Sequence, residues 1–277
     1  MPDAPHKTNQ ERIEANKLYW NDSALFNSKT WDVAGFIADP TKLAPTVRID
    51  QHALEDVRGK TLPHLQCHFG MDTLSWARLG AKVTGLDISP DAIGIARRLA
   101  RDTGITATFV ESPIYDAPSN LQGQFDIVYT GVGALTWLPD IAAWGKVVAG
   151  YVRPGGTFFI RDAHPMLYAL DDGRTDGVLS VAHPYFQQDQ PVAWESDAVW
   201  AGGRKHPPNY SWNHGLGEVF GALTAAGLRI EEFAEHQYMA WQALPQMVEG
   251  DDSQWRMPDH QKRLPLMYSI RASKPAI

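Results

Sequence analysis

Asp87 is the residue whose type and position most directly indicate chemistry. It follows the short apolar segment 82–86 and lies 17 residues after Gly70, which permits a sharp turn of the chain. In nucleotide-binding α/β proteins, an acidic residue about 20 residues beyond such a turn accepts hydrogen bonds from both hydroxyl groups of a ribose. The spacing therefore predicts a nucleoside site in which Asp87 binds the ribose.

Two histidines are candidates for proton transfer. His164 comes shortly after a predicted strand at 157–162, and His214 precedes a predicted amphipathic helix. Imidazole gains and loses a proton near neutral pH, so either side chain could act as a general base toward a protonated nucleophile. We expect His164 and His214 to be catalytic. The alternative for both is a hydrogen bond that orients the substrate or serves the fold alone.

His64, Cys67 and His68 lie close together in the sequence and raise the question of a metal site. His64 falls within a predicted strand, so its side chain need not face the other two, and no fourth ligand is apparent. We therefore predict no metal. Cys67 is the only cysteine, which excludes an intramolecular disulfide, and we expect a buried thiol rather than a nucleophile.

The segment around Asp87 has the pattern of alternating strands and helices. The apolar run 62–65 is predicted to be the first strand, and Gly70 opens a helix that ends near Gly80. A second helix begins after Asp87 and is predicted to end at Gly104. The other predicted elements are strands at 105–110, 125–129, 157–162, 228–233 and 265–272, helices at 141–151 and 216–223, and a PGG turn at 154–156.

This succession resembles the class I methyltransferases that use S-adenosylmethionine. Their motif I is a hydrophobic strand followed by D-x-G-x-G-x-G, and here His64 takes the acidic place. Gln66 and His68 take the first two glycine places, and only Gly70 is retained. The helix, PGG turn and strand after residue 140 also match the family's pattern. The resemblance covers roughly residues 58–165 and 211–275.

The resemblance implies an α/β fold with a Rossmann-like, seven-stranded methyltransferase sheet whose last strand is antiparallel. An N-terminal helical cap, opened by a capping box at Thr8 and Glu11 and running to about Trp20, and an inserted cover after the fifth strand complete the expected fold. The cover is irregular for its length, and loops this long are usually functional. We expect one methyltransferase domain over residues 1–277, made of a cap (1–57), a cofactor-binding core (58–165), a substrate cover (166–210) and a C-terminal core (211–277).

The resemblance also implies where S-adenosylmethionine binds. Gln66 and His68 are expected to replace backbone contacts of a glycine-rich loop with side-chain contacts, and Tyr19 to shield the positively charged sulfur. The expected cofactor-binding residues are Tyr19, Gln66, His68, Gly70, Asp87, Ile88, Pro113, Ile114, Thr130 and Gly131. The expected substrate-binding residues are Trp20, Trp137, His183 and Trp212. Ordinary packing in the core is the alternative for Tyr19, Trp20 and Trp137.

Composition limits the classes of partner. A formal net charge of −7 and a pI near 5.8 argue against nucleic acid, whose binding depends on clustered Lys and Arg. No stretch approaches about 18 uninterrupted apolar residues, so we expect no membrane span. The N-terminal sequence MPDAPHKTNQERIE lacks the apolar run of a signal peptide, which favours a cytoplasmic protein. No pattern specifies an oligomeric state.

Ten tryptophans, several of them in the predicted cap and cover, favour an apolar or aromatic acceptor. We therefore predict methyl transfer from S-adenosylmethionine to a small, apolar or aromatic metabolite. A non-catalytic protein that binds S-adenosylmethionine or another nucleoside is the alternative, because two glycines of the motif are missing. A nicotinamide oxidoreductase is disfavoured, because the chain has no G-x-G-x-x-G that would let the backbone approach a pyrophosphate.

Overall fold

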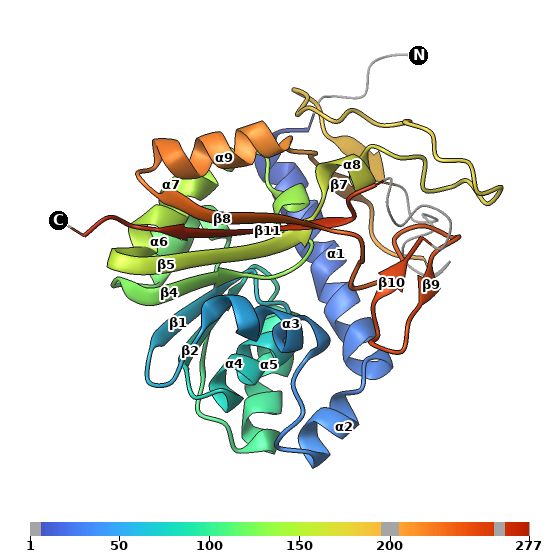
Figure 1. Cartoon of the computed structure of the whole chain (residues 1–277). Helices are drawn as coiled ribbons and strands as arrows, with labels where there is room; N and C mark the ends of the chain where they lie inside the picture. Colours follow the sequence, from blue (N-terminus) through green and yellow to red (C-terminus); the bar gives the residue numbers. More distant parts are fainter. Residues whose placement is uncertain (1–6, 195–204, 258–263, 277) are drawn as a thin grey trace.

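The structure is a computed structural model that describes residues 7–194, 205–257 and 264–276. Its centre is a seven-stranded sheet with the strand order β3-β2-β1-β4-β5-β11-β8 (Figure 1). The strands of this sheet are β1 (Thr61–Leu65), β2 (Lys82–Asp87), β3 (Thr108–Glu111), β4 (Phe125–Thr130), β5 (Val152–Ala163), β8 (Arg229–His236) and β11 (Met267–Ser273).

Strand direction follows the expected pattern. The four contacts among β1 to β5 are all parallel, as they must be when each strand is followed by a helix that returns the chain to the same edge. Strand β11 is antiparallel to both of its neighbours, β5 and β8. This confirms the predicted Rossmann-like sheet with its last strand reversed, and it brings the carboxyl ends of β1, β2, β4 and β5 to one edge.

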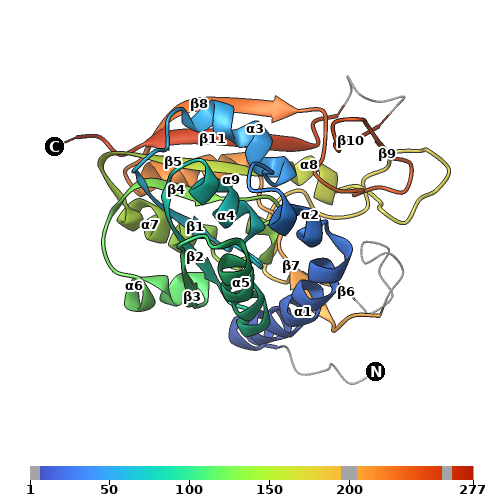
Figure 2. The same ribbon diagram turned by 90° about the horizontal axis from the view of Figure 1, so that it is seen from below.

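Helices cover both faces of the sheet. The helices α3, α4 and α5 pack on one face and α6, α7 and α9 on the other, as the two views show (Figures 1 and 2). The helical elements are α1 (Asn9–Thr30), α2 (Val33–Ala38), α3 (Pro45–Leu54), α4 (Met71–Arg78), α5 (Pro90–Thr103), η1 (Ile114–Asp116), α6 (Ala117–Asn120), η2 (Leu135–Trp137), α7 (Ile141–Tyr151), α8 (Pro165–Tyr168) and α9 (Leu216–Ala225).

Two predicted boundaries were wrong for local reasons. The third strand starts at Thr108, because the Ile105 amide still donates to the Ala100 carbonyl (3.0 Å) and completes the end of α5 around Gly104, whose φ is +67°. The PGG segment at 154–156 is not a turn before the fifth strand. It is an irregularity within β5, where the register with β4 shifts and Gly155 adopts a φ of +72°.

Helix α1 begins with the predicted capping box of Thr8 and Glu11 and runs to Thr30, well beyond the expected end near Trp20. It crosses the carboxyl edge of the sheet and contacts both α5 and β7 (Figure 2). No helix in the described part of the chain combines the length and apolar character needed to cross a membrane.

The predicted cover contains α8 and a small antiparallel pair, β6 (Val192–Trp194) with β7 (Asn209–Ser211). A segment that the sequence did not distinguish lies beside it. This segment follows β8 and contains the strands β9 (Val248–Glu249) and β10 (Trp255–Arg256). Both parts share one apolar cluster, in which Leu167 and Leu170 of the cover pack with Met239, Leu244, Met247, Met257 and Leu266. Two stretches that are distant in the sequence therefore pack together beside the predicted cover.

Candidate functional site

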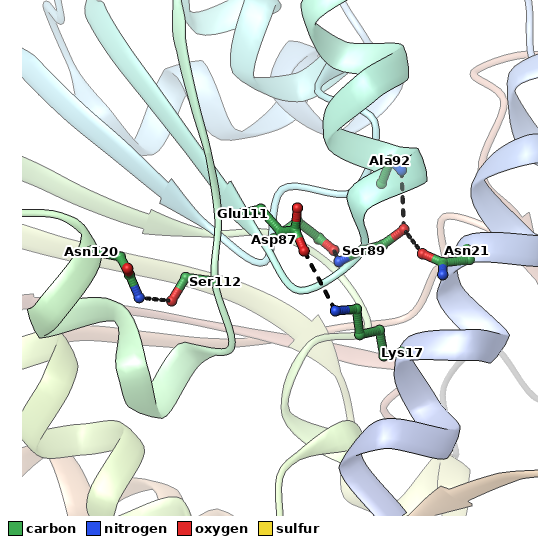
Figure 3. Close-up of polar contacts among 8 residues, drawn as sticks. All are labelled: Lys17, Asn21, Asp87, Ser89, Ala92, Glu111, Ser112 and Asn120. Atoms are coloured by element: carbon green, nitrogen blue, oxygen red, sulfur yellow. Dashed lines mark hydrogen bonds and ion pairs between the residues drawn. The ribbon is translucent and has the colours of Figure 1, made fainter.

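Asp87 ends β2 and is only 7% exposed. Its carboxylate accepts hydrogen bonds from the backbone amides of His68 (2.7 Å) and Ser89 (2.9 Å). It therefore joins the loop after β1 to the start of α5, and Figure 3 shows Asp87 beside Ser89. Burial raises the pKa of Asp87 to about 6, although these amides favour the charged form. The residue that the spacing selected for a ribose thus lies at the predicted edge of the sheet.

The β1 loop (residues 66–70) has a left-handed backbone at the positions where the motif has glycine, although only Gly70 is a glycine here. Gln66, His68 and Gly70 have φ values of +61°, +51° and +81°. These are the three glycine places of the motif, and the left-handed conformation costs roughly 1–2 kcal/mol per non-glycine residue. Glycine is required at the third place, because a Cβ on Gly70 would lie 2.8 Å from the Phe109 ring.

The two side chains that replace glycine face the site. Gln66 donates from Nε2 to the Ala134 carbonyl (2.9 Å), while His68 lies between the rings of Trp20 (5.3 Å between centroids) and Phe69 (4.7 Å). Burial lowers the pKa of His68 to about 3, so its imidazole is neutral. In the described part of the chain, the Gln66 Oε1 and His68 Nε2 atoms are buried without a hydrogen-bond partner. Each is therefore available to a polar ligand.

Substitutions to and from glycine in this loop distinguish the cost of backbone strain from the contribution of side-chain contacts. Gln66→Gly is expected to leave the free energy of unfolding within about 1 kcal/mol of the native value, because losing one hydrogen bond is offset by relief of the left-handed conformation. Gly70→Ala should lower the free energy of unfolding by clearly more than about 1 kcal/mol, because it adds both backbone strain and a clash with the Phe109 ring. Urea denaturation measures both. Equal effects of the two substitutions would contradict this account of the loop.

The β4 loop (residues 131–138) follows Thr130 and is held by Asp162, at the carboxyl end of β5. The Asp162 carboxylate accepts hydrogen bonds from the amides of Gly133 (2.5 Å), Leu135 (2.9 Å) and Ala163 (2.7 Å). Burial raises the pKa of Asp162 to about 6. Our sequence analysis did not assign Asp162 a role, although its position as an acidic residue at the end of a central strand was a usable signal.

Helix α1 contacts the end of β3 and the start of α5. Lys17 lies 3.4 Å from Glu111, the last residue of β3, and Asn21 pairs with Ser89 at the start of α5 (2.6 Å between Oδ1 and Oγ; Figure 3). Ser89 also caps α5 through the Ala92 amide (3.0 Å). The sequence did not single out Lys17 or Asn21, because isolated polar residues on a helix carry no motif.

The aromatic residues of α1 meet the β4 loop. Tyr19 stacks on Trp137 (5.1 Å between centroids), and Trp20 packs edge-on against the same indole (5.0 Å). Because Trp20 also contacts His68, four residues predicted for the cofactor or the substrate form one cluster. This cluster spans α1, the β1 loop and the β4 loop, above the carboxyl ends of the strands.

The predicted adenine-side residues lie along the start of η1. The Ser112 amide donates to the Asp87 carbonyl (2.8 Å), and Asn120 donates to the Ser112 hydroxyl (3.0 Å; Figure 3). Pro113 precedes η1, and the Ile114 side chain is buried in the core beneath α7. Only the backbone of Ile114 is thus in a position to bind a base. Ile88, between Asp87 and Ser89, is half-buried.

Thr130 and Gly131 lie where β4 ends. The Thr130 hydroxyl is buried, and no residue of the described chain pairs with it. A Cβ on Gly131 would lie 3.1 Å from Nε2 of His64, so a larger residue would crowd that imidazole. The structure therefore brings Gln66, His68, Asp87, Thr130 and Gly131 to the same edge of the sheet.

The two candidate bases lie apart from this group and make structural hydrogen bonds. His164 caps α8 by accepting from the Met166 amide at Nδ1 (3.0 Å), and its Nε2 is 3.2 Å from Glu235 Oε1. His214 donates from Nε2 to the Leu138 carbonyl (2.7 Å) in the β4 loop. Burial lowers the pKa of both histidines. No hydrogen bond among the described residues connects either imidazole to Asp87 or to the other.

Trp212 and His183 have different surroundings. Trp212 is buried, and its amide donates to the Thr136 carbonyl (2.8 Å) of the β4 loop. The His183 ring is 5.3 Å from that of Trp194 and lines a small, partly open cavity. The cavity is bounded by the cover and by the segment after β8, and its lining includes Leu167, Tyr168, Leu170, Asp172, Trp241 and Ala243.

Comparison with known proteins agrees with this geometry. A family model described as a methyltransferase domain matches residues 64–158. A ubiquinone biosynthesis O-methyltransferase from Erwinia tasmaniensis is 32% identical over 156 residues, which are 54% of this chain and 63% of that protein. The match thus spans less than two thirds of the relative.

Solved structures extend the likeness to most of the fold. An S-adenosylmethionine dependent methyltransferase from Mesorhizobium loti superimposes with a TM-score of 0.59 at 23% identity, covering 83% of this chain and 97% of that one. A second, from Clostridium acetobutylicum, gives a TM-score of 0.60 at 13% identity over 93% and 99% of the two chains. Taken with the strand order, these similarities show that the chain has the fold of S-adenosylmethionine dependent methyltransferases and that residues 64–158 match a methyltransferase domain.

Proposed function

We propose that this protein transfers a methyl group from S-adenosylmethionine to a small, apolar or aromatic metabolite. The observation that carries the proposal is the grouping of Asp87, the β1 loop and the aromatic cluster of Tyr19, Trp20 and Trp137 at one edge of the sheet. A ribose-binding carboxylate and a set of aromatic faces are what a nucleoside sulfonium requires. The name of the Erwinia relative, an O-methyltransferase, supports the same class of reaction.

The residues present fit the cofactor. Asp87 would bind the ribose hydroxyls, and the backbone near Ile114 would bind the base. The unpartnered polar atoms of Gln66 and His68, buried in the described structure, are suited to the methionine end. The bound cofactor supplies a methyl group on a positively charged sulfur, which aromatic faces attract. Unchanged affinity for S-adenosylhomocysteine in both Gln66→Gly and His68→Gly would contradict the proposed roles of these two side chains.

The acceptor would lie between the aromatic cluster and the cover. Trp20 and Trp137 bound this region on one side, Trp212 packs beneath the β4 loop, and His183 lines the cavity within the cover. Methyl transfer depends chiefly on holding the nucleophile in line with the methyl group, so packing by such residues contributes directly to the rate.

The hydrogen bonds favour His214 over His164 as the general base for a hydroxyl acceptor. Leu138 offers only a carbonyl, so His214 carries its proton on Nε2 and keeps a lone pair on Nδ1. His164 already uses its Nδ1 lone pair for the Met166 amide, and its Nε2 faces Glu235. We therefore propose His214 as the base and His164 as a residue that positions α8.

The affinity for adenosine is expected to rise as pH increases from about 5 to about 7. Burial raises the pKa of Asp87 to about 6, and the ionised carboxylate is the much stronger acceptor for the two ribose hydroxyls. At the lower pH most of the protein must release a proton from Asp87 on binding, which should weaken the affinity by roughly tenfold. Calorimetry across this range measures the effect, with Asp87→Asn as the control that should lack it. A flat profile in the native protein would be inconsistent with ribose binding by Asp87.

The alternative is a protein that binds the cofactor without turnover. The side chains at Gln66 and His68, where the family has glycine, and the Tyr19–Trp137 stack across the site are the observations that favour it. Incubation with methyl-labelled S-adenosylmethionine and a metabolite extract distinguishes the two. Label transfer to an organic-soluble small molecule is the expected result. Binding without transfer to any acceptor would support the non-catalytic alternative.

A further inference from the structure

The fully buried side chains of α1 are mostly polar. They are Arg12, Asn16, Ser23 and Ala24, of which only the alanine is apolar. The apolar side chain of Leu18, by contrast, is 53% exposed. Helices in proteins are usually held in place by burial of an apolar face. The position of α1 therefore depends to an unusual extent on specific hydrogen bonds.

Asn16 joins α1 to the cover. Its Nδ2 atom donates to the Tyr210 carbonyl (2.9 Å), and its Oδ1 atom accepts from the Tyr210 amide (2.8 Å). Tyr210 is the middle residue of β7, which lies beside α1 (Figure 2). A side-chain amide carries one donor group and one acceptor, as a peptide group does, so Asn16 satisfies both backbone groups of Tyr210 in the way a neighbouring strand would.

The same helix reaches the nucleoside side of the sheet edge within two turns of Asn16. Lys17 lies 3.4 Å from Glu111, and the Asn21 Oδ1 atom is 2.6 Å from the Ser89 hydroxyl. Adjacent turns of an α-helix are joined by backbone hydrogen bonds and move together. A ligand that restrains α1 at Lys17 and Asn21 therefore also restrains Asn16.

Strand β7 leads directly to residues that the proposed function assigns to the acceptor. Trp212 follows β7 at once, and its amide donates to the Thr136 carbonyl (2.8 Å) of the β4 loop. His214 comes two residues later and donates to the Leu138 carbonyl (2.7 Å) of the same loop. The position of β7 thus affects where the proposed base and the indole of Trp212 lie.

We infer that Asn16 is a positioning residue that couples the cofactor side of the site to the acceptor side. By holding β7 against α1, it transmits the order that a bound cofactor imposes on α1 to Trp212 and His214. The inference rests on the proposed function. Coupling between two sites requires an element that both of them bias, and α1 together with β7 is that element. The coupling is reciprocal, so an acceptor that orders β7 strengthens cofactor binding by the same factor.

Hydrogen exchange of the native protein, with and without S-adenosylhomocysteine, tests the inference without any substitution. Amides exchange through local opening, so a ligand that holds β7 in place slows their exchange. S-adenosylhomocysteine should slow exchange in residues 209–214 by at least about fivefold, as well as in residues 108–112 at the nucleoside side. Binding of the ligand with unchanged exchange in residues 209–214 would overturn the inference and leave the proposed function intact.

Asn16→Ala should separate the two regions. The slowing caused by the ligand in residues 209–214 should fall to less than about twofold, while that in residues 108–112 persists and the affinity for S-adenosylhomocysteine stays within about fivefold. A purely structural role for Asn16 would speed exchange of residues 209–214 equally in the free and the bound protein. The ratio of the two rates would then be unchanged, and this result would contradict the inference.

Asn213→Ala is the matched control. The Asn213 Nδ2 atom donates to the carbonyls of Pro165 (2.8 Å) and Pro184 (3.0 Å), so this asparagine also makes two hydrogen bonds to the backbone around the cover. Neither bond involves α1. Asn213→Ala should therefore speed exchange of residues 209–214 but preserve the slowing caused by S-adenosylhomocysteine. Loss of that slowing to the same extent as in Asn16→Ala would show that general loosening of the cover is responsible, which would overturn the role of Asn16.

Failure of the folded native protein to bind S-adenosylhomocysteine has a different meaning. That result would overturn the proposed function together with the inference. The native titration is therefore performed before the exchange measurements, so that the two kinds of failure are distinguished.

Discussion

Replacing Asp87 with alanine is expected to weaken binding of S-adenosylhomocysteine by about 100-fold. Two hydrogen bonds to a charged group contribute about 1.5 kcal/mol each, and each 1.4 kcal/mol changes the dissociation constant tenfold. The substitution also removes the acceptor for the His68 and Ser89 amides, so the β1 loop loses its connection to α5. Isothermal titration calorimetry of the native and variant proteins measures the difference.

Glu111→Gln is the matched control for this prediction. Glu111 ends the neighbouring strand β3, but its side chain is 45% exposed and pairs only with Lys17. An exposed ion pair of this kind contributes about 0–1 kcal/mol, so the affinity should change by less than about fivefold. If Asp87→Ala binds as tightly as the native protein, or if Glu111→Gln loses as much affinity, the ribose lies elsewhere.

Replacing Asp162 with alanine is expected to lower the free energy of unfolding by about 3 kcal/mol and to abolish detectable methyl transfer. The amides of Gly133, Leu135 and Ala163 would lose their common acceptor, and each unsatisfied buried donor costs about 1 kcal/mol or more. The β4 loop carries Trp137, so losing its anchor should also displace the aromatic cluster. Urea denaturation measures the stability, and tryptophan fluorescence reports on the cluster.

Asp140→Ala provides the comparison for Asp162. Asp140 accepts from one amide, that of Ala143 (2.8 Å), at the exposed start of α7. Loss of this cap should cost about 1 kcal/mol and leave methyl transfer unaffected. A cost for Asp162→Ala no greater than that for Asp140→Ala would show that the β4 loop does not depend on its anchor in β5.

The succession of strands and helices could be predicted because its signals are local, whereas the topology of the sheet was implied by the resemblance to methyltransferases. Apolar runs of strand length, the N-cap at Ser89 and the helix terminus at Gly104 all depend on neighbouring residues, and all are present. The errors at element boundaries had one local cause and one that involves distant contacts. The start of β3 was misplaced because Ile105 completes α5, and the end of α1 because this helix is stabilised by packing on α5 and β7 rather than by its own apolar pattern.

The candidate site could likewise be predicted only where its residues are marked by local spacing in the sequence. Asp87 and the β1 loop follow from spacing in the sequence, and the structure places them together. The anchoring role of Asp162 depends on three amides, two of them from the β4 loop about 30 residues earlier, which no local pattern indicates. The same is true of Lys17 and Asn21, which reach Glu111 and Ser89 only after α1 crosses the sheet edge.

The left-handed conformations of Gln66 and His68 explain how a loop without two of the expected glycines can still turn from β1 into α4. The two non-glycine residues bear backbone strain at these positions. Gln66 also bonds the β4 loop through the Ala134 carbonyl, but Gln66 Oε1 and His68 Nε2 are buried without a partner in the described structure. Under the proposed function, these two atoms connect the sequence variant to the cofactor.

The most direct test of the central claim is a calorimetric titration of the native protein with S-adenosylhomocysteine, with NADH as the comparison ligand. The arrangement of Asp87, the β1 loop and the aromatic cluster predicts saturable binding of S-adenosylhomocysteine at a single site per chain and no binding of NADH. Absence of S-adenosylhomocysteine binding by the folded protein, or preferential binding of NADH, would contradict the assignment of this edge of the sheet to S-adenosylmethionine.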